Sequence, residues 1–127
     1  MARILGLGGI FVKARDPAAL RAWYRDVLGL DVQDWGGAQL WNDPPRGKNR
    51  TYGVWSAFDP DTKYFEPSTR DFMVNLRVDN LEEVLQQVAE RGGNVLPKRE
   101  ETEDGHVGYV LDPEGVLLEL FQPAELL

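Results

Sequence analysis

The sequence predicts an α+β fold made of two modules, each with the order strand, helix, strand, strand, strand. Two amphipathic helical patterns, over residues 16–29 and 80–92, each follow a strand-like segment and a residue that favours a helix start. Three short strand-like segments follow each helix, so the same order occurs twice. The length of 127 residues fits a single domain, 1–127, with modules over about residues 4–58 and 71–122.

The first module opens with GLGGIFVKARDP at residues 6–17. A dinucleotide-binding glycine loop follows a strand and begins a helix, whereas these glycines precede the apolar run 10–14. We therefore interpret the run as part of a strand and not as the flank of a phosphate-binding loop. Asp16 then provides an N-cap, and Pro17 suits the first helical position because its missing N–H would have no partner there.

The first helix carries apolar residues spaced three and four apart and is expected to end at Gly29. This stripe, which should pack on a sheet, consists of Leu20, Trp23, Tyr24, Val27 and Leu28. Strands are expected over 30–34, 38–41 and 51–58, separated by glycine and proline turns. Residues 59–70 contain two prolines and several charges, which predicts an exposed connection between the modules.

The second module repeats the pattern from residue 71. Residues 71–78 alternate as a strand, and Asn80 with Glu83 forms a capping-box signature. The helix is expected to end at Gly92-Gly93. Strands over 94–98, 106–111 and 116–121 complete the module, the last two joined by the turn DPEG.

The composition argues against several kinds of partner. Fourteen Lys and Arg residues against twenty-one Asp and Glu residues give a net charge of −7, so neither nucleic acid nor an anionic membrane is expected to bind. The absence of cysteine excludes disulfides, thiolate catalysis and cysteine-ligated zinc, and it fits a cytoplasmic protein. No segment approaches the roughly twenty apolar residues of a membrane helix.

One helix per module covers one face of a sheet, so the other face must pack on a partner or form a cup for a ligand. The chain resembles the vicinal oxygen chelate superfamily, which includes glyoxalase I, extradiol dioxygenases and bleomycin-resistance proteins. The motifs that carry the resemblance are KARDPAALRAWYRDVLGL, NLRVDNLEEV, ERGGNV and above all GYVLDPEGVLLELFQP. The resemblance implies paired βαβββ modules in a curved, cup-shaped mixed sheet, with helices on the outer face, a ligand on the concave face and frequently a homodimer.

Metal-dependent members of this superfamily place His, Glu or Gln at four sheet positions. Carried across by spacing, these positions fall on Gly9, at or near Trp55, on Met73 and on Glu119. Glycine and tryptophan supply no donor, and a thioether is a poor ligand for the divalent metals that these enzymes use. One carboxylate does not hold a catalytic metal, so we expect no metal and no other cofactor. The only histidine, His106, is expected on the surface or at the pocket rim.

Glu119 is the candidate catalytic residue and the candidate polar anchor of the cup. Strand alternation and the superfamily geometry add further candidates for ligand binding: Phe11, Lys13, Trp41, Tyr52, Trp55, Met73, Asn75, Arg77, Tyr109 and Phe121. The alternative is that Glu119 forms a structural ion pair with Arg77 or Lys13 and that the aromatic residues belong to an ordinary core.

Two classes of function follow. The first is a metal-free protein of the bleomycin-resistance-like type that binds a small molecule, for which the acidic charge and four tryptophans suggest a cationic ligand. The second is a glyoxalase-like lyase or dioxygenase-like enzyme that uses Glu119, either without metal as a general base or with a non-standard metal site. In both cases the expected partners are a small molecule and a second copy of the chain.

Overall fold

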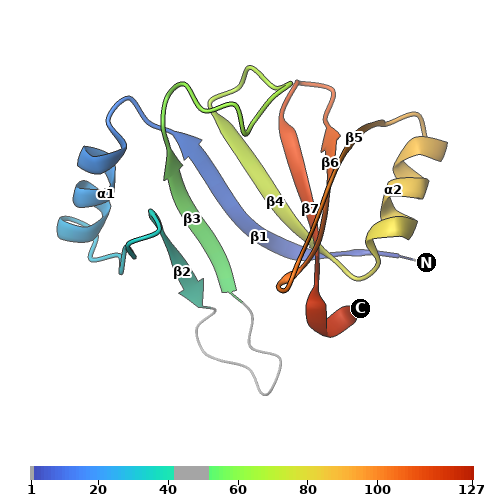
Figure 1. Ribbon diagram of the computed structural model, residues 1–127, viewed down its shortest axis with the longest axis horizontal. Helices are drawn as coiled ribbons and strands as arrows, with labels where there is room; N and C mark the ends of the chain where they lie inside the picture. The colour runs from blue at the N-terminus through green and yellow to red at the C-terminus, as the bar shows by residue number, and fades with distance from the viewer. Residues whose placement is uncertain (1, 42–51) are drawn as a thin grey trace.

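The computed structural model describes residues 2–41 and 52–127. They form one seven-stranded mixed sheet of order β2-β3-β1-β4-β7-β6-β5, which is strongly curved and carries a helix at each end (Figure 1). This confirms the predicted α+β class with its curved open sheet. The elements run β1 (Ile4–Lys13), α1 (Pro17–Asp26), β2 (Gly37–Trp41), β3 (Tyr52–Phe58), β4 (Phe72–Val78), α2 (Leu81–Glu90), β5 (Asn94–Thr102), β6 (Gly105–Leu111), β7 (Leu117–Pro123) and the short 3₁₀ helix η2 (Ala124–Leu126).

The two halves of the chain use the same pairing. β1 pairs in parallel with β3 in the first half, and β4 pairs in parallel with β7 in the second. The halves join through the antiparallel pair β1–β4 at the centre of the sheet. This arrangement brings the middle of β1, β4 and β7 side by side.

One predicted strand is wrong, because residues 30–34 are not a strand and pair with none of the strands that the structure describes. Leu30 and Val32 are half-buried against the core between α1 and β3, and their N–H groups bond locally, that of Leu30 to the Tyr24 carbonyl at 3.0 Å. The alternating apolar pattern therefore reflects packing under the helix and not sheet pairing. Among the described residues, the first half consequently has one strand fewer than the second.

Both α-helices begin directly after the predicted N-cap residues, Asp16 and Asn80. The Asp16 side chain accepts a hydrogen bond from the Ala19 N–H at 3.1 Å, and the Asn80 side chain accepts one from the Glu83 N–H at 3.1 Å. α2 buries Leu81, Val84 and Leu85 on the outer face of the sheet. α1 ends at Asp26, earlier than predicted, and of its apolar stripe Trp23, Val27 and Leu28 stay exposed while Leu20 and Tyr24 contact the sheet.

The connection over residues 59–70 is not simply exposed, which corrects the sequence prediction. Phe65 is fully buried and packs with Met73, Tyr109 and Leu117. The segment is fastened to the turn before β7, where the Ser68 hydroxyl donates to the Gly115 carbonyl at 2.5 Å. The connection thus folds onto the face of the sheet opposite the helices and closes one side of the cup. Within the described ranges, no helix has the length and apolar character needed to cross a membrane.

Candidate functional site

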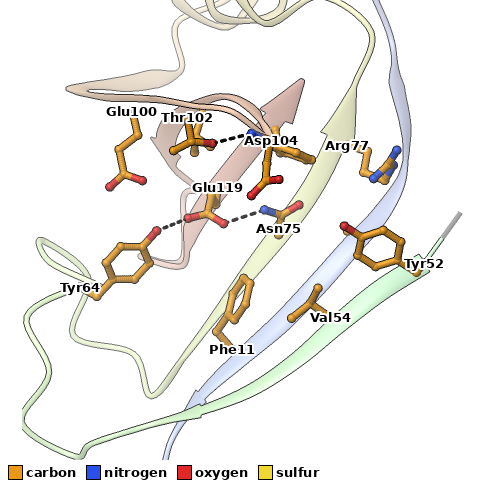
Figure 2. A pocket seen from close by; sticks show the side chains of 13 residues that line it. Phe11, Tyr52, Val54, Tyr64, Asn75, Arg77, Glu100, Thr102, Asp104 and Glu119 are labelled. Carbon is orange, nitrogen blue, oxygen red and sulfur yellow. Dashed lines mark hydrogen bonds between the residues drawn. The ribbon is translucent and has the colours of Figure 1, made fainter. Parts of the chain in front are cut away.

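The concave face of the sheet holds a cavity of about 250 Å³, seen from close by in Figure 2. Residues from β1, β3, β4, β5, β6, β7 and two connecting segments converge on it. Its lining consists of Gly8, Phe11, Tyr52, Val54, Tyr64, Asn75, Arg77, Glu100, Thr102, Asp104, Val107, Glu119 and Phe121. Aromatic, aliphatic and charged side chains are therefore combined in one concave site, as is usual for small-molecule sites.

Glu119 lies at the centre of this lining and is only 6% exposed. It sits on β7 opposite Asn75 of β4 and opposite Tyr109 of β6. The Asn75 Nδ2 donates to Glu119 Oε1 at 2.6 Å, and the Tyr64 hydroxyl lies 2.5 Å from Oε2 (Figure 2). The Tyr109 hydroxyl lies 3.1 Å from the same oxygen. All the donors to this carboxylate that the described residues provide are neutral.

The two hydroxyls also lie 2.9 Å from each other, so three oxygens are linked by only two hydroxyl protons. Tyr64 and Tyr109 cannot both donate to Glu119 and to each other at once. Because a carboxylate offers about four acceptor positions, at least one position on Glu119 stays open to a further donor. Burial, followed by the charge and hydrogen bond of Glu119, raises the pKa of Tyr64 well above its usual value. Burial, the hydrogen bond with Tyr64 and the charge of Glu119 do the same to the pKa of Tyr109, so both phenols remain protonated donors at neutral pH.

Packing holds the two tyrosine rings in place. The Tyr64 ring stacks on Phe58 with 5.6 Å between ring centroids. The Lys98 ammonium lies 4.4 Å from the centroid of Tyr64 and 4.7 Å from that of Tyr109, and it pairs with Glu100 at 3.7 Å. Lys98 thus fixes the rings from outside without forming an ion pair with Glu119.

The structural ion pairs that were the alternative role for Glu119 do not form. Arg77 pairs instead with Glu125 at 3.7 Å, and the Lys13 ammonium lies over the Phe65 ring at 5.4 Å. Over residues 2–41 and 52–127, no cation lies within ion-pair distance of Glu119. Among the described residues, only neutral hydrogen-bond donors contact this buried carboxyl group.

Asn75 adds a second hydrogen-bond acceptor to the cavity, and this acceptor receives no hydrogen bond from the described residues. Its Oδ1 is buried and has no hydrogen-bond partner among the described residues, while its Nδ2 is committed to Glu119. This oxygen fills the space beside Gly8, where an added Cβ would lie 2.0 Å from it. Glycine at position 8 is therefore what allows Asn75 to lie against β1 and reach Glu119.

The lining carries more negative than positive charge. Glu100, Asp104 and Glu119 supply three carboxylates, against the single guanidinium of Arg77 among the described lining residues. Glu100 has Lys98 as a partner, whereas the carboxylate of Asp104 has no cation within ion-pair distance in the described part of the chain. Such a site favours a ligand with positive charge or several N–H donors.

Six of the residues predicted from sequence lie in the lining: Phe11, Tyr52, Asn75, Arg77, Glu119 and Phe121. Tyr109 is buried outside the lining and contributes to the site only by its hydrogen bond to Glu119. Met73 and Lys13 contact Phe65 and are not part of the lining. The side chain of Trp41 lies outside the described residues, and His106 lies outside the lining, on β6.

Trp55 lies on the opposite face, which corrects its assignment to the cup. Its ring stacks on Tyr24 of α1 with 4.0 Å between centroids, and its neighbours are Ala14 and Ala57. Tyr52 and Val54 occupy the cavity side of the same strand. Since side chains alternate along a strand, Tyr52 and Trp55, three positions apart, cannot share one face.

Seven lining residues were not predicted: Gly8, Val54, Tyr64, Glu100, Thr102, Asp104 and Val107. Alternation from Tyr52 indicates Val54, and alternation from Tyr109 indicates Val107. Glu100 and Thr102 lie beyond residue 98, where the strand was expected to end. The adjacent aromatics Tyr64 and Phe65, within an otherwise polar connection, are the available signal that this segment folds back onto the sheet.

The residues around Glu119 do not fit a transition metal. The nearest side chain on β4 is Asn75, two positions from the Met73 expected at that site, and β3 contributes Val54 in place of Trp55. Within the described ranges, no three His, Cys, Asp or Glu residues come close enough to share a metal ion. The hydroxyls of Tyr64 and Tyr109 also occupy the carboxylate oxygen that a metal would need.

The glyoxalase-like domain model matches residues 9–121. No curated protein matches the sequence. Among solved structures, methylmalonyl-CoA epimerase from Mycobacterium tuberculosis is 20% identical with a TM-score of 0.60 and coverage of 95% of this chain and 89% of its own. Methylmalonyl-CoA epimerase in complex with methylmalonyl-CoA is 16% identical with a TM-score of 0.67, and 98% of each chain is covered. A glyoxalase/bleomycin resistance protein/dioxygenase superfamily member from Vibrio splendidus 12B01 is 16% identical with a TM-score of 0.61, covering 96% of this chain and 99% of its own.

At these identities the likeness to solved structures concerns the fold. The family match spans nearly the whole chain, including β1, which contributes Phe11, and β7, which contributes Glu119. The chain therefore belongs to the glyoxalase-like domain family, within the vicinal oxygen chelate superfamily.

Proposed function

We propose that this protein binds a small cationic or N–H-donating molecule in the cavity around Glu119, without a metal ion. This is a binding function of the bleomycin-resistance-like type, in which a member of the superfamily holds its ligand and does not transform it. The ligand places its positive or donating group against Glu119 and its apolar part against Phe11, Tyr52 and Phe121.

The observation that carries this proposal is that Glu119 is buried and has no cationic partner among the described residues. A buried carboxylate is costly unless donors or cations compensate its charge. Tyr64, Tyr109 and Asn75 supply neutral donors, and no described cation lies within ion-pair distance. A cationic ligand would complete this compensation, and Asn75 Oδ1 is a second acceptor in the same wall without a donor of its own.

The rest of the lining supports the same kind of ligand. Glu100 and Asp104 add negative charge to the lining, and Phe11, Tyr52 and Phe121 add aromatic surface to it. By contrast, the acyl-CoA named for the epimerases carries several phosphates on its coenzyme A group. An acidic lining disfavours such a polyanion, so we do not extend the epimerase activity to this chain.

Calorimetric titration with two probes of the same shape tests the proposal. Benzylamine is a cation at neutral pH, and benzyl alcohol is its neutral counterpart. In the presence of a chelator, we expect benzylamine to bind at least about tenfold more tightly, because a hydrogen bond to a charged group contributes about 1.5–3 kcal/mol. Equal affinities, or binding that requires added divalent metal, would contradict the proposal.

A further inference from the structure

Arg77 is a largely buried cation of the cavity with unused donors. Its side chain is 14% exposed, and the guanidinium lies 6.0 Å from the centroid of the Phe121 ring. It makes no hydrogen bond with the described part of the chain, although a guanidinium offers five N–H donors in a planar fork. Its single ion pair there, 3.7 Å to Glu125, is longer than a charge-assisted hydrogen bond.

The partner of Arg77 is easily displaced. Glu125 is 71% exposed and belongs to η2, the short 3₁₀ helix after β7. Arg77 lies where the cavity around Glu119 meets a second cavity of about 220 Å³ that Glu125 lines. A rotation of the exposed Glu125 side chain toward solvent would therefore free the guanidinium without any change in the sheet.

The two charges are placed so that one small ligand can reach both. Arg77 follows Asn75 by two positions on β4, and Asn75 pairs with Glu119 on the neighbouring strand. Strand geometry then places the Cα atoms of Arg77 and Glu119 about 8 Å apart on the same face. Figure 2 shows Arg77 and Tyr52 on one side of the cavity, with Glu119 nearer the middle and Tyr64 beyond it.

We propose that Arg77 is a second anchor of the cavity, which binds a carboxylate of the ligand in the place that Glu125 occupies in the free protein. This inference rests on the proposed function and narrows it: the ligand is a zwitterion, with a cationic group at Glu119 and a carboxylate at Arg77. The planar guanidinium matches a carboxylate through two parallel hydrogen bonds. Glu125 then competes with the ligand for Arg77, so that anions that bind weakly do not displace it.

Para-aminomethylbenzoate tests this arrangement, because its ammonium and carboxylate lie at opposite ends of one ring. Its methyl ester keeps the cation and the shape but lacks the negative charge, and benzylamine lacks the second group altogether. We expect the wild-type protein to bind the zwitterion about tenfold more tightly than the ester, as measured by calorimetry. Arg77→Gln should remove this preference, so that the variant binds the zwitterion and the ester with equal affinity.

Glu125→Gln provides the complementary variant, since an exposed residue of the C-terminal turn can change without affecting folding. We expect it to raise the affinity for the zwitterion severalfold and to leave the affinity for benzylamine unchanged. If benzylamine binds through Glu119 but the zwitterion gains nothing over the ester, the Arg77 anchor is wrong and the proposed function stands. If neither benzylamine nor the zwitterion binds, both proposals fail. An unchanged preference in a folded Arg77→Gln protein would also overturn the anchor.

Discussion

The Tyr64 hydroxyl lies 2.5 Å from Glu119 Oε2 although the two residues are 55 positions apart in the chain. Tyr64 comes from the connection between the two halves, and Glu119 comes from the last strand. The contact therefore links the connection over residues 59–70 to β7, which lies in the concave face of the sheet. It also makes the position of the carboxylate depend on a residue outside the sheet.

Replacing Tyr64 with Phe removes this donor and keeps the ring. We expect the free energy of unfolding, measured by urea denaturation, to fall by about 1–3 kcal/mol, because a buried carboxylate loses a hydrogen bond. Tyr24→Phe is the matched control, since the Tyr24 ring stacks on Trp55 and its hydroxyl has no hydrogen bond within the described residues. Equal losses in the two variants would show that the Tyr64 hydroxyl does not support Glu119.

The raised pKa values of Tyr64 and Tyr109 predict a loss of stability at alkaline pH. In the unfolded chain these phenols release their protons near pH 10, whereas burial and Glu119 keep them protonated in the folded protein above that value. The unfolded state then binds fewer protons, so their contribution is fully present below about pH 10 and declines as pH rises further. Each tyrosine adds at most about 1.4 kcal/mol per pH unit.

Urea denaturation between about pH 9 and pH 11 measures this slope, with Tyr109→Phe as the comparison. The variant lacks one of the two groups, so its stability should fall less steeply than that of the wild type. Near-ultraviolet absorbance should show in parallel that two of the four tyrosines ionise only as the protein unfolds. Identical slopes for the two proteins would mean that Tyr109 titrates normally in the fold.

Gly8 predicts a specific steric effect on the site. A Cβ added there would lie 2.0 Å from Asn75 Oδ1, so Gly8→Ala should push Asn75 away from Glu119. We expect a loss of about 1–3 kcal/mol in stability, as for other overpacked positions, together with weaker binding of benzylamine. Gly53→Ala is the control, because its Cβ would meet none of the described atoms closer than 3.9 Å. A Gly8→Ala protein with wild-type stability and binding would show that Asn75 can move freely.

We also expect a homodimer. Ile4, Leu5, Leu7 and Ile10 of β1 and Phe72 of β4 are exposed at the centre of the sheet, and β2 and β5 are open edges in the described part of the chain. An apolar surface of this kind favours association with a second copy. Light scattering at micromolar concentration should give twice the mass of one chain, and Leu7→Glu should give one chain mass. A monomer for the wild type would refute this expectation.

Local sequence signals predicted most of the fold. Asp16, Pro17 and Asn80 begin the helices where expected, since caps act through hydrogen bonds to residues two or three positions away. The strand predicted over residues 30–34 failed because alternation records which side chains are buried, not whether the backbone finds a partner strand. The early end of α1 has the same origin: its stripe is apolar, but only Leu20 and Tyr24 reach the sheet.

The site was less accessible to sequence reasoning. Alternation from Glu119 leads to Phe121, and the parallel pairing with β4 leads to Asn75 and Arg77. Tyr64 reaches Glu119 because its neighbour Phe65 anchors the connection over residues 59–70 in the core. The core contacts of Phe65 come from residues distant in sequence, so local patterns do not reveal them. The bulge in β1 near Gly8 shifts the phase of that strand, and a regular alternation cannot anticipate it.

Titration of benzylamine into Glu119→Gln tests the central claim most directly. The amide keeps the size of the side chain, and Asn75 can turn its own amide to match it. Glu101→Gln is the matched control, because this exposed residue neighbours Glu100 on β5 and lies outside the cavity lining. We expect the affinity for benzylamine to fall by roughly ten- to a hundredfold, about 1–3 kcal/mol, in Glu119→Gln and to stay unchanged in Glu101→Gln. Equal affinity in a folded Glu119→Gln protein would show that Glu119 is structural and that the ligand binds elsewhere.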